Sequence, residues 1–308
     1  MVLVCGDPLE PVTAFFCSRL KALGIGYRTL DLGAAPDALS IEWSWSNAWP
    51  SGSMLFADST VDFSELTGVY FRNVLPDEPD DEAEKSEETV QIYPRTDPRL
   101  AGLLNSVPCR VVNRPESTDS NRSKPYQALI IRQFGFAIPK TLISNDPDAA
   151  RHFYDECEGK LICKSMSGVR SIVRRVNKED LGNFDLWADR PIQLQEYLPG
   201  DNIRVHVIGE RVFAVRIQCE AVDYRYAGAE GYARTMVPET LPGDVATNCL
   251  RLTKEFGLAM SGIDLKETPA GQYHCFEVNT SPAFPFYESL TRPVIADALA
   301  EYLAGKSA

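Results

Sequence analysis

Two short apolar segments near the end of the chain carry the polar side chains that most constrain this sequence. Residues 262–265 and 275–282 both have the composition of buried strands, and the turn-forming residues between them predict a hairpin. Asp264 lies in the first strand. Glu277 and Asn279 lie two residues apart in the second, so they share one face of it. Such a hairpin would bring two carboxylates and one carboxamide together.

These three side chains predict a magnesium site. Carboxylate and carboxamide oxygens on one face of a sheet form a hard site that suits Mg²⁺, with phosphate oxygens and waters completing an octahedron. The alternative is that the polar groups simply satisfy one another beside a loop. Burying two carboxylates with no Lys or Arg nearby would cost several kcal/mol, which favours the metal site.

A second feature is suited to holding phosphates. Lys164 ends the apolar segment 161–164 and is followed by a loop rich in Ser and Gly, residues 165–171. An ammonium group and the backbone N–H groups of such a loop can together bind phosphate oxygens. The alternative is an ordinary turn between two strands. Lys124, at the start of an expected helix, is a second lysine whose charge is unfavourable there unless an anion lies nearby.

The segment 194–204 runs from an extended strand into a Pro-Gly turn and then into another strand. An extended backbone entering such a turn can present its polar groups to the edge of an adenine, and its side chains to a ribose. An interdomain linker would have the same pattern, and these residues favour neither interpretation.

The N-terminal third has the pattern of a small α/β unit with a parallel sheet. Residues 2–5 and 27–32 predict strands on either side of an amphipathic helix over 12–23, and 111–113 predict the last strand of the unit. A dinucleotide-binding domain also begins in this way, but the GxGxxG motif is absent. The Trp-rich segment 41–49 is interpreted as a packed hairpin or an edge.

The rest of the chain predicts two further units. The acidic, proline-rich run 75–84 is interpreted as a solvated loop, and 114–121 as a linker that leads into a helix over 124–134. Beyond residue 203 long antiparallel strands are expected, covered by helices over 245–256 and 292–303.

Composition narrows the class of protein. The chain has 308 residues, enough for two or three compact units, and its net charge of −12 disfavours non-specific binding to nucleic acid. Its eight cysteines include no CxxC pair and fit reduced structural thiols. No signal peptide is recognisable, and no apolar run reaches the roughly 20 residues of a membrane span. We therefore expect a cytoplasmic protein.

The ordered set of these motifs resembles the ATP-grasp superfamily. Phe276-Glu-Val-Asn-Thr-Ser-Pro282 is similar to the D-alanine–D-alanine ligase and ribosomal-S6-modifying (RimK-like) branches. The resemblance covers the last two-thirds of the chain. It implies an ATP-grasp fold, α/β in the N-terminal part and α+β in the C-terminal part. A small N-terminal domain (1–113) would be followed by two subdomains (114–195 and 196–308) that clasp ATP.

The resemblance also implies a role for each matching residue. Lys124 and Lys164 would contact ATP phosphates, and Gln195 the adenine amino group. Asn202 stands where the family usually has an acidic ribose ligand. The implied catalytic arginines are Arg204, Arg216 and Arg225, with Arg216 stabilising the transferring phosphoryl group. The remaining implied nucleotide contacts are Ser165, Ser167, Gly168, Glu196, Tyr197, Leu198 and Asp201, and two Mg²⁺ ions would be held by Asp264, Glu277 and Asn279.

An ATP-grasp enzyme of this kind would be an ADP-forming ligase that joins a carboxylate to an amine or hydroxyl through an acyl-phosphate. We expect a peptide or amino-acid substrate, with a graspetide-type macrocyclase as a narrower possibility. Against the macrocyclase, residues 283–287 read Ala-Phe-Pro-Phe-Tyr, where those enzymes tend to have a Gly-Gln-Trp run. A non-catalytic ATP-binding regulator is the alternative from another class. Whether the chain forms a homo-oligomer stays open, and the candidate substrate contacts are Arg72, Tyr224, Arg234 and Tyr287.

Overall fold

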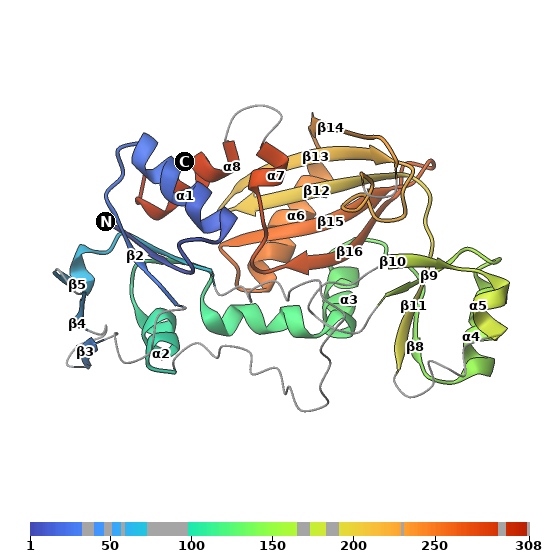
Figure 1. Cartoon of the computed structure of the whole chain (residues 1–308), viewed down its shortest axis with the longest axis horizontal. Coiled ribbons are helices and arrows are strands. Elements are labelled where there is room, and N and C mark those ends of the chain that lie inside the picture. Colours follow the sequence, from blue (N-terminus) through green and yellow to red (C-terminus); the bar gives the residue numbers. More distant parts are fainter. Residues whose placement is uncertain are drawn as a thin grey trace.

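The computed structural model shows a mixed α/β protein with several sheets (Figure 1). It includes a parallel N-terminal sheet of four strands and antiparallel sheets of four, five and three strands. No helix among the placed residues is long and apolar enough to cross a membrane. The structure describes residues 1–32, 40–45, 51–56, 59–72, 98–164, 173–182, 191–228, 231–288 and 294–306. The acidic run 75–84 and the loop with Ser165, Ser167 and Gly168 lie outside these ranges, so their predicted roles stay predictions.

The N-terminal sheet is parallel, with strand order β2-β1-β6-β7, as its β-α-β pattern predicted. All four residues of β1 and of β6 are buried, as expected for parallel strands covered on both faces. Helix α1 begins where the Glu10 carboxylate accepts a hydrogen bond from the Thr13 N–H. The elements of this unit are β1 (Val2–Cys5), α1 (Pro11–Ala22), β2 (Tyr27–Leu30), β6 (Gly68–Phe71), α2 (Pro98–Ser106) and β7 (Arg110–Val112).

A second, antiparallel sheet of three strands flanks this unit. It contains β3 (Ser40–Ser44), β4 (Ser51–Leu55) and β5 (Thr60–Asp62), and a short 3-10 helix, η2 (Phe63–Glu65), follows. Trp43 pairs with Gly52 across β3 and β4, so the described part of the Trp-rich segment is one strand of a hairpin.

The central unit is an antiparallel sheet with order β10-β9-β11-β8. Helix α4 covers one face, where Ala150 and Phe153 pack against Leu161 and Leu194. The expected linker is a 3-10 helix instead, η3 (Pro115–Arg122). The other elements are α3 (Lys124–Gln133), β8 (Thr141–Ser144), α4 (Pro147–Glu156), β9 (Leu161–Lys164), β10 (Val173–Val176), α5 (Lys178–Gly182) and β11 (Ile192–Glu196).

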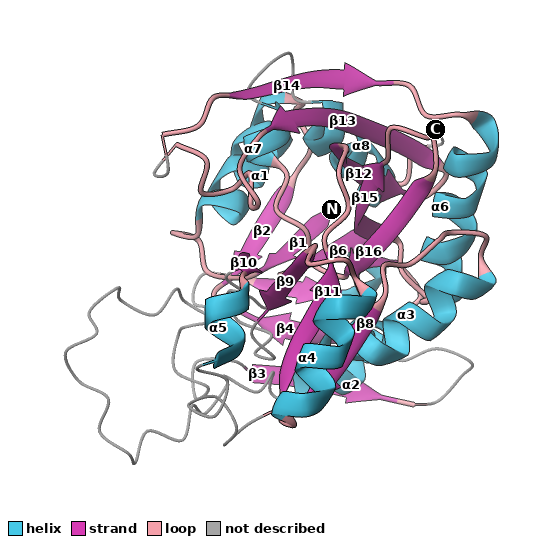
Figure 2. Ribbon diagram, turned by 90° about the vertical axis from the view of Figure 1, so that its right-hand side faces the viewer, coloured by secondary structure: helices cyan, strands magenta, loops and turns pink. Residues whose placement is uncertain are grey.

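The C-terminal sheet has five antiparallel strands in the order β14-β13-β12-β15-β16. Helix α6 covers the face that carries Val205 and Ile263, and α3 packs beside β16 (Figure 2). The Gln127 side chain of α3 bonds both backbone groups of Val278. The elements are β12 (Asp201–Ile208), β13 (Arg211–Cys219), β14 (Arg234–Glu239), α6 (Gly243–Glu255), β15 (Met260–Glu267), β16 (Tyr273–Asn279), α7 (Pro285–Glu288) and α8 (Val294–Leu303).

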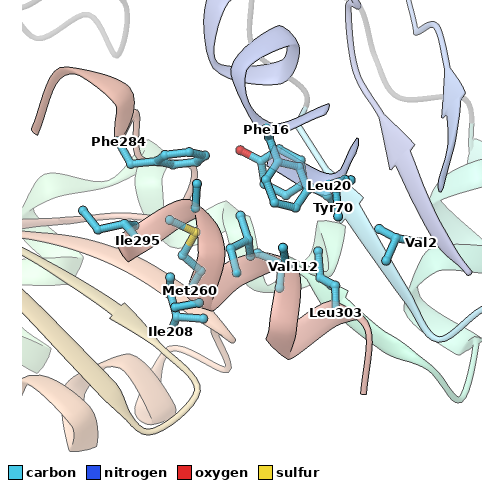
Figure 3. Close-up of a cluster of buried hydrophobic side chains, with 14 of the residues drawn as sticks. Val2, Phe16, Leu20, Tyr70, Val112, Ile208, Met260, Phe284, Ile295 and Leu303 are labelled. Carbon is cyan, nitrogen blue, oxygen red and sulfur yellow. The ribbon is translucent and has the colours of Figure 1, made fainter. Parts of the chain in front are cut away.

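The two ends of the chain share one hydrophobic core. Helix α8 returns to pack against α1, β6 and β7, and Phe284, Met260 and Leu303 meet Phe16 and Val112 in a single cluster (Figure 3). The N-terminal sheet and the C-terminal segment pack against each other through this shared hydrophobic core. The division at residues 113 and 195 stays a prediction.

Candidate functional site

A cavity of about 310 Å³ lies between the central and C-terminal sheets. Its lining comes from β9 and β10 on one side and from β12, β15 and β16 on the other, with Lys124 of α3 at its edge. Most of the residues selected from the sequence meet here, although they are spread over more than 150 positions of the chain.

The three predicted oxygen ligands share the cavity wall. Asp264 pairs directly with Glu277 across β15 and β16, and all three line the cavity. The register shifts between Asp264 and Leu265, where Cys275 replaces Phe276 as the next partner. This bulge lets Phe276 and Glu277 both line the cavity, while Cys275 and Val278 stay buried in the core beneath α6.

The charges around these ligands correct the expectation that no Lys or Arg lies near the two carboxylates. Cations do lie nearby: Arg204 Nη1 donates to Asp264 Oδ1 at 2.7 Å, and Lys124 Nζ lies 3.8 Å from Glu277 Oε2. Both carboxylates keep an exposed fraction toward the cavity, 28% and 33% of the side chain. Asn279 Oδ1 accepts the Ser281 N–H at 3.0 Å and has a second lone pair. The oxygens of Asp264, Glu277 and Asn279 therefore fit a hard divalent cation, which could bind while their present contacts are kept.

Lys164 is placed to meet an anion. Its Nζ lies 5.2 Å from the Phe276 ring centroid. Burial lowers the pKa of Lys164 to about 8, an effect that Glu277 opposes and Lys124 strengthens. A buried ammonium beside a second lysine is stabilised by any phosphate that enters between them.

The opposite part of the cavity can take an adenine. Glu196, Tyr197 and Leu198 line it. Gln195 Nε2 donates to Thr141 Oγ1 at 3.1 Å, whereas its Oε1 is buried and has no hydrogen-bond partner in the described part of the chain. Gln195 does not line the cavity itself, but it pairs in register with Ile162, which does, so its free buried acceptor lies next to this wall and suits an amino group.

Lys266 is a cavity residue that the sequence analysis missed. It pairs in register with Asn202, and both line the cavity. Lys266 Nζ donates to the Leu198 carbonyl at 3.2 Å, and its pKa is lowered, mainly by burial. Lys266 therefore places a positive charge beside Asn202, the position at which the ATP-grasp pattern usually has an acidic ribose ligand.

Arg204 and Arg225 approach the cavity from different elements. Arg204 extends from β12 and is buried, with Nη2 against Gly262, where an added Cβ would lie only 2.4 Å away. Arg225 lies in the loop after β13 and pairs with Asp223 at 2.5 Å. Both line the cavity beside Tyr224 and Tyr287.

Arg216 lies on the other face of the same sheet. It is the register partner of Ile203, which packs in the core beneath α6 and also borders the cavity, whereas Arg204, the next residue along β12, lines the cavity. Its guanidinium bonds three carboxylates at 2.6–3.1 Å, those of Asp201, Glu239 and Glu267. The structure therefore brings neither Arg216 nor Asp201 to the cavity. In this structure both belong to an ion-pair network, and their predicted roles at the phosphates and the nucleotide stay predictions.

The comparisons with known proteins agree with this architecture. No family model matches the chain. A probable alpha-L-glutamate ligase of Shewanella denitrificans is 27% identical over 203 residues, which span 62% of this chain and 68% of that protein. A similar protein of Chromohalobacter salexigens is 26% identical over 63% of this chain, and the match spans just under two thirds of that relative, 66%.

Solved structures cover nearly the whole chain. The macrocyclase MdnC of Microcystis aeruginosa, bound with its precursor peptide MdnA, has a TM-score of 0.76 at 24% identity, covering 98% of this chain and 99% of that one. A RiPP-associated ATP-grasp ligase of Chryseobacterium gregarium, in complex with ADP and a leader and core peptide, has a TM-score of 0.79 at 20% identity over 100% and 97%. The ATP-grasp ligase PsnB, complexed with a minimal precursor, has a TM-score of 0.78 at 24% identity, covering 99% of this chain and 98% of that one.

The fold is that of the ATP-grasp ligases, which confirms the predicted fold class. In sequence the chain is similar to probable glutamate ligases, and in fold it is similar to peptide-modifying ATP-grasp ligases.

Proposed function

We propose that this ligase uses ATP and Mg²⁺ to join a carboxylate of a peptide substrate to an amine or hydroxyl, with ADP as a product. The observation that carries the proposal is the meeting of two kinds of group in one cavity. Asp264, Glu277 and Asn279 supply oxygens, and Lys124 and Lys164 supply positive charge opposite them. This combination holds the phosphates of a nucleotide with a divalent cation.

Each residue group then has a task in the reaction. The backbone at Glu196 and Leu198 and the free oxygen of Gln195 would hold the adenine. Lys124 and Lys164 would hold the phosphates, and Asp264, Glu277 and Asn279 would hold two Mg²⁺ ions. The metal, when bound, neutralises charge on the phosphate oxygens.

The chemistry proceeds in two displacements. A carboxylate oxygen of the substrate attacks the terminal phosphorus of ATP, and the bond to ADP breaks. The acceptor nitrogen or oxygen then attacks the acyl carbon, phosphate leaves with the bonding electron pair, and the acceptor loses its proton. Arg204 and Arg225 neutralise charge at the reacting end of the cavity. No protein nucleophile is required.

The full-length likeness to ligases solved with precursor peptides supports a peptide as substrate. A macrocyclase that links two side chains of one peptide is a second candidate, because a macrocyclase is among the structures that match end to end. We also propose a cytoplasmic location, with which eight free cysteines agree.

Release of ADP tests the proposal. The purified chain is incubated with Mg²⁺, ATP and a panel of peptides containing Asp, Glu, Lys, Ser and Thr, and ADP and product mass are measured. We expect ADP to form only with a subset of peptides and to cease when Mg²⁺ is chelated. A product lighter than its substrate by the mass of water would identify intramolecular linkage. Tight ATP binding with no ADP from any peptide would favour the non-catalytic regulator.

A further inference from the structure

Two tyrosine hydroxyls meet inside the cavity without a role in the chemistry above. Tyr224 comes from the loop between β13 and β14, and Tyr287 comes from the short helix α7. Both side chains line the cavity, and their Oη atoms lie 3.0 Å apart. This distance is that of a hydrogen bond, so segments more than 60 residues apart in sequence are joined at the site.

The pair lies at the reacting end of the cavity. The Tyr287 ring centroid is 5.5 Å from Arg204 Cζ and 5.2 Å from the His206 ring. Along β12, Asn202 stands near the adenine wall, and His206 is four residues further on. At the rise of a β-strand this is about 13 Å away. The tyrosines therefore lie beyond Asp264 from the adenine wall, where the terminal phosphate and the group that receives it must meet.

One O–H donor of the two hydroxyls remains unused by the contact between them. Two phenol groups carry two O–H protons, and the contact between them uses one. Within the described ranges, neither hydroxyl has another hydrogen-bond partner. The second proton is therefore available to a molecule in the cavity.

Both phenols remain neutral under ordinary conditions. Burial raises the pKa of Tyr224, and burial also raises the pKa of Tyr287, although Arg204 opposes the effect on Tyr287. A neutral phenol donates a hydrogen bond and removes no proton from a substrate. The pair is therefore a donor and not a general base.

We propose that Tyr224 and Tyr287 together bind the substrate carboxylate that is activated beside Arg204. The inference rests on the proposed function and assigns the acid-binding residues of that site. A carboxylate can accept the free O–H with one oxygen while it faces the positive charge of Arg204 and Arg225. A neutral amine that accepted the free O–H would engage the lone pair with which it must attack, so the pair serves the acid and not the amine.

Removal of both hydroxyls tests the assignment. The probes are N-acetyl-L-glutamate and N-acetyl-L-aspartate, with ATP, Mg²⁺ and hydroxylamine, which converts an acyl-phosphate into a measurable hydroxamate. The variant is Tyr224→Phe/Tyr287→Phe. Tyr232→Phe is the matched control, because Tyr232 lies in the same loop, is 45% exposed and does not line the cavity.

We expect the double variant to lower kcat/KM for the carboxylate by about 10- to 100-fold, the range of a lost hydrogen bond to a charged group. The KM for ATP and the thermal midpoint should stay at the wild-type values, which loss of folding would not allow. Each single variant keeps one hydroxyl and its proton, so we expect a smaller loss. Tyr232→Phe should behave like the wild type.

The alternatives are distinguishable. Hydroxamate formation by the double variant at the wild-type rate would overturn the tyrosine assignment and leave the ligase function intact. A rise in the KM for ATP that matches the loss for the acid would overturn it as well, since the pair would then act through the nucleotide. If the wild type neither binds these acids in calorimetric titration nor releases ADP with any peptide, the proposed function fails and the assignment fails with it.

Discussion

Arg204 and Asp264 form a hydrogen-bonded ion pair across adjacent strands of the C-terminal sheet, 2.7 Å between Nη1 and Oδ1. Arg204 is buried, and Asp264 is partly exposed to the cavity. The pair neutralises two charges that would otherwise be costly to bury, and it fixes the guanidinium beside the place where a metal would bind. A cation bound by Asp264 would share this carboxylate with Arg204.

Gly262 leaves the space that Arg204 occupies. An added Cβ would lie 2.4 Å from Arg204 Nη2 and 2.5 Å from the Pro282 Cβ, closer than such atoms approach. We expect Gly262→Ala to displace the guanidinium and to lower ligase activity by about 100- to 1000-fold, the range seen when one group that stabilises developing charge is lost. Gly243→Ala is the control, because nothing lies within 4 Å of its Cβ position. Equal activity of the two variants in ADP release would show that the position of Arg204 does not matter.

Arg216 has a structural role in this account. It bonds three carboxylates on the face away from the cavity, and the sum of these contacts raises its pKa. We expect Arg216→Ala to lower the free energy of unfolding by about 1–3 kcal/mol, because charged partners lose their hydrogen bonds. The folded fraction should keep its ADP release, measured below the thermal midpoint. Loss of turnover without loss of stability would restore the phosphoryl-transfer role predicted from sequence.

The contrast between Arg204 and Arg216 shows what the sequence could not establish. Both stand on apolar strands after the Pro-Gly turn, and either could have faced the nucleotide. The side of an antiparallel sheet depends on register, and a shift of one residue reverses it. The pairing of Arg216 with Ile203 decides the matter, and no local pattern reveals that pairing.

Other features were predictable because their signals are local. The period-2 pattern at Asp264, Glu277 and Asn279 correctly placed three oxygens in one cavity wall. Lys266 was missed, because a lysine near the end of a strand usually lies in solvent, and its burial depends on the distant Leu198 carbonyl. The common core of Phe16 and Phe284 likewise depends on contacts between the two ends of the chain.

Asn113 holds the N-terminal unit against the C-terminal sheet. Its Oδ1 accepts the N–H groups of Ala259 and Met260, and its Nδ2 donates to the carbonyls of Met260 and Thr280, all at 2.7–3.0 Å. We expect Asn113→Ala to lower the free energy of unfolding by about 2–4 kcal/mol, because buried backbone groups lose their partners. Urea unfolding measures this change. A loss below the error of the fit would contradict the role of Asn113 as the connection between the units.

His206 predicts a dependence of stability on pH. Burial, followed by the charge of Arg204, lowers the pKa of His206 from its ordinary value of 6.5 to about 3. Between these two pH values the unfolded chain binds a proton that the folded chain does not, so stability falls as the pH falls through this window. This group alone should reduce the free energy of unfolding by about 2 kcal/mol between pH 7 and pH 5.

The matched variant for this prediction is His206→Gln. Its amide can still donate to the Ala283 carbonyl, which His206 Nε2 contacts at 3.1 Å, but it does not titrate. Urea unfolding at both pH values should show a smaller pH effect in the variant than in the wild type. An identical pH effect in both proteins would mean that other groups control the acid sensitivity.

The fate of one oxygen atom tests the central claim most directly. A peptide found to support ADP release is labelled with heavy oxygen in its carboxylates and allowed to react with ATP and Mg²⁺. If the carboxylate attacks the terminal phosphorus, one labelled oxygen must leave with the phosphate when the acyl-phosphate is opened. We predict phosphate that carries one heavy oxygen per product formed, together with ADP. Unlabelled phosphate, or AMP with labelled oxygen, would contradict an acyl-phosphate formed in this cavity.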